Sequence, residues 1–482
     1  MATNTDAPLK ADQLGEILEK QKAAFLAELP VQMAARKDRI RRLMKLVHDH
    51  ADAIVAAMSK DFGHRSADQS KMTDIVGVLN SARHALKHMD AWAKAEKRPV
   101  QFPLGLLGAR ARVEYQPLGV VGIIAPWNFP VQLCLTPAIG ALAAGNRVMI
   151  KNSEYTETTS NLLAELGPQY FDVSEVAFFT GGPDVGQAFS ELPFNHLLFT
   201  GATSVGHHIM RAAAKNLVPV TLELGGKSPA IVGRGADKAK SAQRITMGKM
   251  MNAGQICIAP DYLYVPREDE REIIDAIRES AATLYPTLLA NDDYTAVVNE
   301  RHHQRLSGYL DDARAKGAEV IEVNPAGEDF KSANSRKMPL HIVRNVTDDM
   351  KVMQDEIFGP ILPVKTYSTV DEAIDYVNGR DRPLALYYFG EDGDEAKKVT
   401  DRTVSGGVTL NDTIFHVAME DLPFGGVGPS GMGAYHGLDG FRTFSHAKGI
   451  YSQPRIDVAK LAGFLPPYGA TTQKTIARDM KL

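Results

Sequence analysis

The chain has 482 residues, more than a single hydrophobic core usually serves, so two or more domains are expected. Hydrophobic residues make up 44% and charged residues 23%, a balance typical of globular proteins and unlike disordered or fibrous ones. The net charge of −4 provides no cationic field for nucleic acid, and two cysteines are too few for a disulfide framework or a cysteine-rich metal site.

The N-terminal residues 1–9 are polar and lack the basic and apolar regions of a secretion signal. No apolar run anywhere in the chain approaches the roughly 20 residues that a membrane span requires. Free thiols without a disulfide framework are the rule in the reducing cytoplasm, so we expect a cytoplasmic protein. The charge and the lack of a long apolar run lead us to expect a soluble protein with no membrane or nucleic-acid partner.

The first hundred residues predict helices, because apolar residues recur there at steps of three and four. The stripes consist of Leu14, Leu18 and Phe25, then Ile40, Leu43 and Val47, then Ile75, Leu79, Ala82, Leu86 and Met89. A basic cluster lies on the second stretch, and we expect a solvated helix face in preference to a binding patch. The cluster is Arg36, Lys37, Arg39, Arg41 and Arg42.

Residues 99–116 change character, since prolines and glycines punctuate two short segments at 104–107 and 110–115. This pattern predicts a hairpin that projects from the first domain. Such a hairpin either pairs with a partner subunit or is a simple surface excursion.

After residue 119 the chain alternates short apolar strands with helices. We expect strands at 120–124, 147–151, 176–180, 196–200 and 218–222. Short apolar strands separated by helices indicate a parallel sheet covered on both faces, and therefore an α/β fold. Ligands bind such a sheet beyond the carboxyl ends of its strands, so the residues after each strand are the candidates for function.

Two of these strand ends carry polar side chains. The stiff loop 126–130 follows the first strand and holds Asn128 as an amide donor, although Asn is also common in turns for backbone reasons. The second strand ends at Lys151 with Glu154 three residues on. This pair could bind ribose hydroxyls, or it could be an exposed ion pair of little energetic value.

The fourth strand runs into Gly201, Thr203 and Gly206 and then a helix over 206–216. A glycine turn before a helix N-terminus is suited to a pyrophosphate, although the spacing is a relaxed form of the dinucleotide motif. The strict motif at Gly426, Gly428 and Gly431 lacks a crossover unit after it and is interpreted as a chance match. The phosphate-loop resemblance of 226–228 is rejected because Thr221 stands where that motif requires glycine.

The fifth strand delivers Glu223 at an apolar end, and Cys257 follows within a stretch of small residues and amides, 252–260. The interval allows one helix to return the thiol towards the carboxylate. A buried carboxyl can have a raised pKa and act as a base, so the two residues could form a nucleophile and base pair. A structural carboxylate paired elsewhere is the alternative.

Taken together and in this order, seven segments resemble the NAD(P)-dependent aldehyde dehydrogenase superfamily. They are 126–130, 151–154, 199–203, 223–229, 254–257, 356–360 and 423–428, and the resemblance covers nearly the whole chain. Within the superfamily, 259–262, 411–413 and 430–437 are most similar to the class three branch.

The resemblance implies two Rossmann-type parallel-sheet domains plus a small projecting oligomerisation hairpin, assembled as a homodimer. Residues 1–226 would form the dinucleotide-binding domain, with the hairpin 99–116 projecting from it. Residues 227–411 would form the catalytic domain, with a strand at 361–367 and a helix at 371–377. Residues 412–482 would return to the cofactor domain and contact the other subunit.

The resemblance also implies a reaction. Cys257 would attack the aldehyde, while the Asn128 amide and the Cys257 backbone N–H would hold the oxyanion. Glu223 would activate water to hydrolyse the resulting thioester. The expected substrate is an aromatic aldehyde such as coniferyl aldehyde or a medium-chain one, with general fatty or aliphatic aldehydes as the alternative; no metal is expected.

The cofactor is expected to be NAD, with NADP possible. By resemblance, Lys151 and Glu154 would bind the adenosine ribose, and Gly201, Thr203 and Gly206 the pyrophosphate. Glu356 would bind the nicotinamide ribose, and Phe358 and Trp127 would complete the cofactor set. Two residues depart from the family pattern, Ala202 where serine is frequent and Asn152 where proline is usual.

Two other classes of function are considered. A cysteine hydrolase would use Cys257 and Glu223 without redox chemistry, and a binding protein would keep an idle site. His302 and His303 are expected at the surface and not in a metal site. Cys134 is expected to be a packed thiol near the substrate channel.

Overall fold

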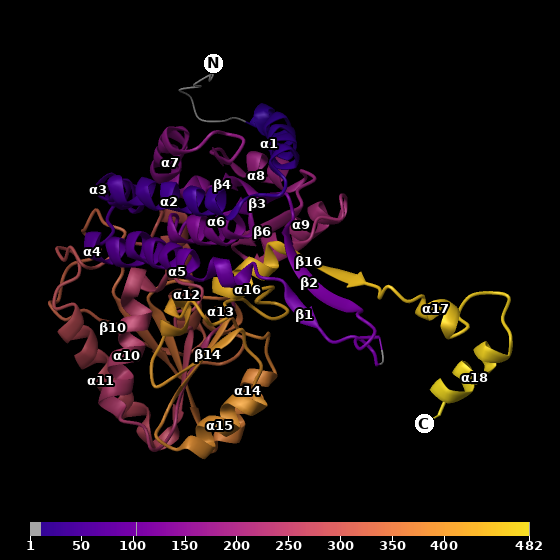
Figure 1. The fold of residues 1–482 in the computed structure, drawn as a ribbon. Coiled ribbons are helices and arrows are strands. Elements are labelled where there is room, and N and C mark those ends of the chain that lie inside the picture. The colour runs from indigo at the N-terminus through magenta and orange to yellow at the C-terminus, as the bar shows by residue number, and fades with distance from the viewer. Residues whose placement is uncertain (1–10, 103, 482) are drawn as a thin grey trace.

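A computed structural model describes residues 11–102 and 104–481 of the chain. It contains a six-stranded sheet of order β15-β7-β6-β3-β4-β5, a seven-stranded sheet of order β10-β11-β12-β9-β8-β13-β14 and a three-stranded sheet of order β1-β2-β16 (Figure 1). The predicted α/β fold with two parallel-sheet units and a small projecting sheet is confirmed.

The six-stranded sheet contains the five strands predicted after residue 119. β3, β4 and β6 have the predicted bounds, β5 is one residue shorter, and β7 is shifted towards Glu223. Their side chains are almost all buried, because helices cover both faces of the parallel strands. The strands are β3 (Val120–Ile124), β4 (Arg147–Lys151), β5 (Val176–Phe179), β6 (His196–Thr200), β7 (Val220–Glu223) and the short antiparallel β15 (Gly431–Met432).

Eight longer helices lie around this sheet, and the three predicted stripes form buried faces on α1, α2 and α5. Ile75 of the third stripe precedes α5, in a short π-helix at Lys71–Val76. The helices are α1 (Leu14–Glu28), α2 (Met33–Asp49), α3 (Ala51–Phe62), α5 (Gly77–Trp92), α6 (Gln132–Ala144), α7 (Glu157–Tyr170), α8 (Pro183–Ser190) and α9 (Thr203–Ala214).

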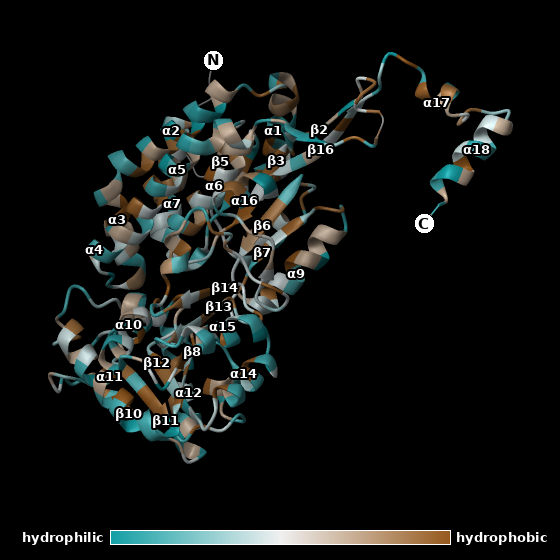
Figure 2. Ribbon diagram, turned by 60° about the horizontal axis from the view of Figure 1, so that its bottom comes forward, coloured by the Kyte–Doolittle hydropathy of each residue, from teal (hydrophilic) through white to brown (hydrophobic). Residues whose placement is uncertain are grey.

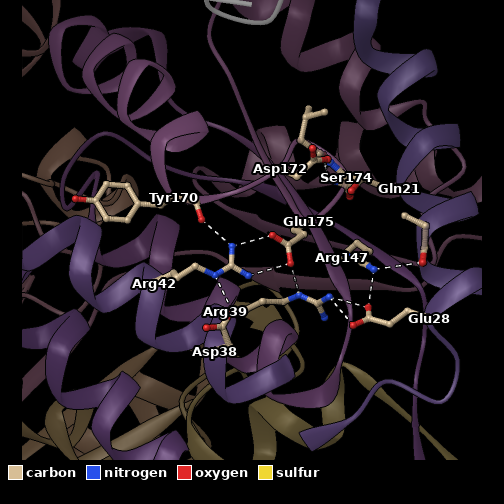
Figure 3. A network of polar contacts seen from close by, with 12 residues as sticks. Gln21, Glu28, Asp38, Arg39, Arg42, Arg147, Tyr170, Asp172, Ser174 and Glu175 are labelled. Carbon is tan, nitrogen blue, oxygen red and sulfur yellow. Dashed lines mark hydrogen bonds and ion pairs between the residues drawn. The ribbon is translucent and has the colours of Figure 1, made fainter. Parts of the chain in front are cut away.

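The basic cluster on α2 corrects one expectation, because Arg36 and Arg39 are buried and not solvated. Arg39 donates to Glu28 at 2.7 Å and to Glu175 at 2.9 Å, and Arg147 joins Glu28 at 2.5 Å (Figure 3). The acceptors come from the end of α1 and the start of β5, so their proximity is created only by the fold. A helical wheel of α2 alone cannot reveal them.

The predicted hairpin at 99–116 is only partly present. β2 (Arg110–Pro117) forms as expected, but its partners are β1 (Glu96–Arg98) and β16 (Ser445–Ser452), while 104–107 forms turns. Pro103 lies outside the described residues. The sheet projects from the body as predicted (Figure 1), but its third strand comes from the far end of the chain.

The seven-stranded sheet forms a second core. β12 has the predicted bounds, and the helix predicted at 371–377 is α14 (Val370–Asn378). Figure 2 shows hydrophobic residues concentrated on the strands inside the body and hydrophilic residues on the outer helices. The other strands are β8 (Pro229–Val232), β9 (Tyr262–Pro266), β10 (Glu319–Val323), β11 (Leu340–Arg344), β13 (Ala385–Phe389) and β14 (Gly407–Leu410), with helices α10 (Lys238–Met250), α11 (Glu270–Leu284), α12 (Glu300–Ala315) and α15 (Gly393–Arg402).

Neither rejected phosphate motif forms a phosphate site. The strict glycine motif lies in the loop that forms β15, where a Cβ on Gly431 would stand 2.1 Å from the Leu222 carbonyl oxygen, so glycine permits close backbone packing. Lys227 pairs with Asp261 and donates to the carbonyls of Val352 and Asp355 at 2.6 and 2.9 Å. The lysine is therefore already bound within the protein.

The chain after β16 forms an arm with two short helices, α17 (Val458–Leu461) and α18 (Ala470–Asp479). The arm stands clear of the body in both views (Figures 1 and 2). It carries large exposed apolar side chains, among them Leu461, Phe464 and Tyr468. No helix in the described part of the chain is long and apolar enough to cross a membrane.

Candidate active site

A cavity of about 1490 Å³ opens at the carboxyl ends of β3, β4, β6 and β7. It is lined on one side by the residues that follow these strands and on the other by segments of the second sheet unit. Ten of the eleven predicted site residues line it: Trp127, Asn128, Lys151, Glu154, Gly201, Thr203, Glu223, Cys257, Glu356 and Phe358.

Gly206 is the predicted residue that the cavity lining does not include. It is buried on α9, where a Cβ would stand 3.0 Å from a methyl group of Leu224. This glycine therefore lets the helix pack closely against the end of β7.

Cys257 is presented by a left-handed turn after α10. Asn252, Ala253 and Gly254 all have positive φ, at 50°, 51° and 71°. Positive φ is costly for residues other than glycine, so the surroundings must hold the turn. Gln255 does so, because its amide nitrogen donates to the carbonyl of Asn252 at 2.9 Å and its amide oxygen accepts from the Val298 N–H at 2.9 Å.

Asn128 lies beside this turn. Its side-chain amide donates to the carbonyl of Gln255 at 3.1 Å, and the residue is buried. Its own carbonyl accepts from Asn252 Nδ2 at 3.2 Å. The oxyanion donor expected from the sequence is thus tied to the turn that carries the thiol.

Glu223, the last residue of β7, is 1% exposed. Burial raises its pKa to about 8, while a hydrogen bond with the Cys257 thiol acts in the opposite direction. Burial, followed by the negative charges of Glu223 and Glu356, raises the pKa of the Cys257 thiol well above its ordinary value. A carboxylate with a pKa near 8 is a stronger base than an ordinary one and can take a proton from the thiol or from water.

Glu356 and Phe358 enter the cavity from the second sheet unit. Burial, with the charge of Asp261, raises the pKa of Glu356 to about 8. A Cβ on Gly225 would stand 2.1 Å from Glu356 Oε2, so that glycine lets the carboxyl approach the β7 loop. Phe358 meets Trp127 edge to face, with ring centroids 5.2 Å apart.

Lys151 and Glu154 form the predicted pair, with Lys151 Nζ 3.1 Å from Glu154 Oε2. Lys151 is buried, while Glu154 is exposed in the cavity. The alternative of an ion pair exposed at both ends is therefore wrong for the lysine. Asn152, where proline is usual in the family, is buried and turns both side-chain polar atoms away from any partner among the described residues.

The N-terminus of α9 faces the cavity at Thr203. Ala202, at the position before the helix, provides no side-chain cap, so the first backbone amides of α9 keep their capacity to bind an anion. Thr200 also lines the cavity, and its buried hydroxyl has no partner among the described residues. These donors suit a phosphate-bearing ligand.

The Aldehyde dehydrogenase family profile matches residues 6–450. The chain belongs to this family. It is 54% identical over 469 residues to a probable coniferyl aldehyde dehydrogenase of Caulobacter vibrioides, covering 97% of each chain. It is 51% identical over 463 residues to a coniferyl aldehyde dehydrogenase of Pseudomonas sp., covering 96% of this chain and 95% of that protein.

Among solved structures, the chain is similar to the substrate-bound state of Staphylococcus aureus AldH. The TM-score is 0.89 at 36% identity, covering 96% of this chain and 99% of that one. The chain is an NAD(P)-dependent aldehyde dehydrogenase, which oxidises an aldehyde to the carboxylic acid. The cavity fits the dinucleotide, since it offers the free α9 amides, the unpartnered Thr200 hydroxyl and the Lys151–Glu154 pair.

This aldehyde dehydrogenase has cavity residues that sequence reasoning missed. His302 was expected at the surface, but it packs on Trp127 with ring centroids 5.0 Å apart, and burial lowers its pKa to about 4. Arg305 and Arg380 also line the cavity. They lie on helices and loops of the other sheet unit, and no local motif marks them.

Two further groups are buried without lining the cavity. Cys134 is a packed thiol on α6, as expected, and burial raises its pKa. Lys249 on α10 is buried, and desolvation lowers its pKa to about 8. The described residues contain no group of three or more His, Cys, Asp or Glu side chains that could hold a metal.

Proposed function

We propose that this aldehyde dehydrogenase oxidises an aromatic aldehyde such as coniferyl aldehyde, and that Cys257, Asn128 and Glu223 carry the reaction. The substrate is supported by the names of the two relatives that are 54% and 51% identical over nearly the whole chain. The roles rest on one observation: the thiol, the amide and the buried carboxyl meet in a single cavity.

In the first step, Cys257 Sγ attacks the aldehyde carbon and forms a carbon–sulfur bond. The thiol proton passes to the Glu223 carboxylate, which the hydrogen bond between the two groups favours. The carbonyl oxygen becomes an oxyanion, which the Asn128 amide and the Cys257 backbone N–H stabilise.

Bound NAD(P)⁺ would supply the acceptor for the hydride that leaves the aldehyde carbon as the carbon–oxygen double bond re-forms. Cys257 then holds the acyl group as a thioester. Glu223, after releasing its proton to solvent, takes a proton from water as the water oxygen attacks the thioester carbon. The carbon–sulfur bond breaks, and the carboxylic acid leaves.

The cofactor would be held by residues from both sheet units. Lys151 and Glu154 would bind the adenosine ribose. The turn from Gly201 to Gly206 would bind the pyrophosphate through the residues that line the cavity, Gly201 and Thr203. Glu356 would bind the nicotinamide ribose, with Phe358 and Trp127 beside the ring. NAD is preferred in this proposal because the Glu154 carboxylate repels a 2′-phosphate, while Lys151 allows some use of NADP.

We further propose a division into residues 1–226, 227–411 and 412–482 and a cytoplasmic homodimer. The division is supported by the strands of the seven-stranded sheet, which all lie between 229 and 410. The dimer is supported by the projecting sheet β1-β2-β16 and by the apolar arm that follows it. β16 exposes most of its residues, and the arm exposes Leu461, Phe464 and Tyr468.

The proposal is tested by measuring the near-ultraviolet absorbance of reduced nicotinamide. The substrates are coniferyl aldehyde, benzaldehyde, hexanal and a long-chain aldehyde, each with NAD and with NADP. The highest kcat/KM is expected for coniferyl aldehyde with NAD. A higher value for the long-chain aldehyde would contradict the aromatic substrate. Cleavage of a phenyl ester with no dinucleotide-dependent oxidation of any aldehyde would favour a cysteine hydrolase.

A further inference from the structure

Three polar side chains between α3 and α5 are buried without any role in the reaction described above. Arg65 is 1% exposed, Asp74 is fully buried, and Gln69 is nearly so. An ion pair taken out of water loses much hydration and is weak support for stability by itself. The contacts of Arg65 and Asp74 should therefore explain why this pair is buried.

Arg65 and Asp74 bracket the loop that carries Asn128. Arg65 Nη1 donates to the Asn128 carbonyl oxygen at 2.8 Å, and Nη2 donates to Asp74 Oδ2 at 2.8 Å. Asp74 Oδ1 accepts from the backbone N–H groups of Val131 and Gln132, at 3.2 and 3.1 Å. The pair thus holds the loop at Asn128 and again at the start of α6.

Gln69 reaches the other catalytic loop. Its Oε1 accepts from the backbone N–H of Asn252 at 2.9 Å, at the first residue of the left-handed turn before Cys257. Asn252 Nδ2 in turn donates to the same Asn128 carbonyl that Arg65 binds. One short segment therefore anchors both the oxyanion donor and the nucleophile turn.

The backbone of residues 67–76, which carries Gln69 and Asp74, has an unusual conformation. α4 (Ala67–Ser70), capped by the Ser66 hydroxyl, runs into the π-helix Lys71–Val76, which contains Asp74. π-Helical segments are rare and are frequently found at functional sites. Several buried atoms in this segment lack partners among the described residues, namely Arg65 Nε, Gln69 Nε2 and Ser70 Oγ. Unsatisfied polar atoms cost stability, so the arrangement is better explained by geometry than by stability.

We propose that Arg65, Gln69 and Asp74 are positioning residues, which hold the Asn128 amide at a set distance from Cys257. They touch neither substrate nor cofactor and act through the Asn128 carbonyl and the Asn252 N–H. The proposal rests on the roles given above to Asn128 and Cys257.

The expected effect follows from the steep dependence of catalysis on geometry. A misplacement of about 1 Å in a catalytic group can lower the rate about 100-fold. Asp74→Asn keeps the shape of the side chain but turns an amide N–H₂ towards Arg65 or towards the α6 amides, so one set of bonds is lost. We expect kcat to fall roughly 10- to 100-fold. The KM for NAD should stay within about twofold, because Lys151 and Glu154 lie on another strand end.

A second variant replaces Gln69. Because this side chain is neutral, the Arg65–Asp74 ion pair stays intact. Gln69→Met removes the acceptor for the Asn252 N–H at similar length and should lower kcat about tenfold. Gln69→Glu keeps an acceptor oxygen at that position and should recover most of the lost rate. If Gln69 only fills space, Gln69→Glu should not restore kcat.

The matched control is Arg39→Met. Arg39 is buried and pairs with two carboxylates (Figure 3), whereas Arg65 pairs with one. Neither Arg39 nor its partners Glu28 and Glu175 line the cavity. Each variant is compared by its thermal unfolding midpoint, by kcat and KM, and by the rate at which iodoacetamide alkylates Cys257. The control should lose stability while keeping kcat and the alkylation rate within about twofold.

The proposal is overturned if Asp74→Asn and Gln69→Met have the same kcat and the same alkylation rate as the Arg39→Met control, at comparable unfolding midpoints. If Asp74→Asn does not fold, Gln69→Met and Gln69→Glu decide the matter. If the unmodified protein oxidises no aldehyde, the proposed function fails. The alkylation rates still test whether this segment holds the Cys257 turn.

Discussion

The side-chain amide of Asn128 donates to the backbone carbonyl of Gln255 at 3.1 Å, two residues before Cys257. The oxyanion donor and the nucleophile turn are therefore joined before a substrate arrives. An amide has two N–H bonds, so one of them stays available for the oxyanion. This preorganisation avoids rearranging the donor during the reaction, which is where electrostatic catalysis gains most.

Replacement of Cys257 tests the nucleophile. Cys257→Ala should lower kcat for aldehyde oxidation by about 10³-fold or more, because the other cysteine, Cys134, does not line the cavity. Cys134→Ala is the matched control, since it removes the other cysteine from a fully buried position on α6. It should keep kcat within about twofold and cost roughly 1 kcal/mol of stability for the lost packing. Equal activity of Cys257→Ala and the control would exclude the thiol as nucleophile.

Replacement of Glu223 tests the base. Glu223→Gln keeps the shape but cannot accept a proton, so thioester hydrolysis should slow about 100-fold. The first turnover should also release reduced cofactor more slowly, because the Cys257 thiol loses the carboxylate that accepts its proton, and stopped-flow absorbance would record this. In the unmodified enzyme, steady-state kcat should rise with pH through about 8 as Glu223 ionises. A kcat of Glu223→Gln equal to that of the unmodified enzyme would remove Glu223 from this role.

The same carboxyl links stability to pH. Burial raises the pKa of Glu223 from 4.5 to about 8, so the folded state binds its proton more tightly than the unfolded state. The resulting stabilisation is complete below pH 4.5 and is lost as the pH rises through 8. Glu223→Gln has no such loss, so its free energy of unfolding relative to the unmodified enzyme should improve between pH 5 and pH 8.5, on the order of 1–3 kcal/mol. Urea unfolding at both pH values measures this, and a parallel decline of the two proteins would contradict the raised pKa.

Cofactor preference depends on Glu154 in the proposed binding mode. Glu154→Gln removes the charge that repels a 2′-phosphate, while buried Lys151 remains to bind it. The ratio of kcat/KM for NADP to that for NAD should rise about tenfold. Glu157→Gln, an exposed carboxylate at the start of α7 outside the cavity lining, is the control and should leave the ratio unchanged. An unchanged ratio in both variants would place the 2′-phosphate elsewhere.

The arm after β16 is expected to cover a second copy of the chain. Removing residues 453–482 should convert the dimer to a monomer, because Leu461, Phe464 and Tyr468 would no longer bury their exposed apolar surface. Light scattering coupled to gel filtration measures the mass. Leu461→Glu with Phe464→Glu should weaken the dimer in the full-length chain, whereas Lys474→Glu on α18 changes a charge without removing apolar surface and should not. A truncated chain that remains dimeric would assign the contact to the projecting sheet alone.

Several elements of this protein could be predicted from the sequence because their causes are local. The strands β3, β4 and β6 occur at the predicted residues, since a short apolar run bounded by turn residues inside a parallel sheet has few other ways to bury its side chains. The parallel sheet also determines that side chains after consecutive strands gather at one edge. For this reason Asn128, Lys151 and Glu223 line one cavity.

The remaining features depend on contacts between residues far apart in the chain. Arg39 is buried because Glu28 and Glu175 meet it, and β2 gains β16 as its partner across more than half of the sequence. The same holds for Arg65, whose bond to the Asn128 carbonyl crosses 63 positions. A charged side chain has the same local pattern whether it is solvated or paired in the interior. The local pattern of residues therefore specifies the sheet and the side chains at its edge, whereas long-range contacts specify which charges lie inside and what they hold in place.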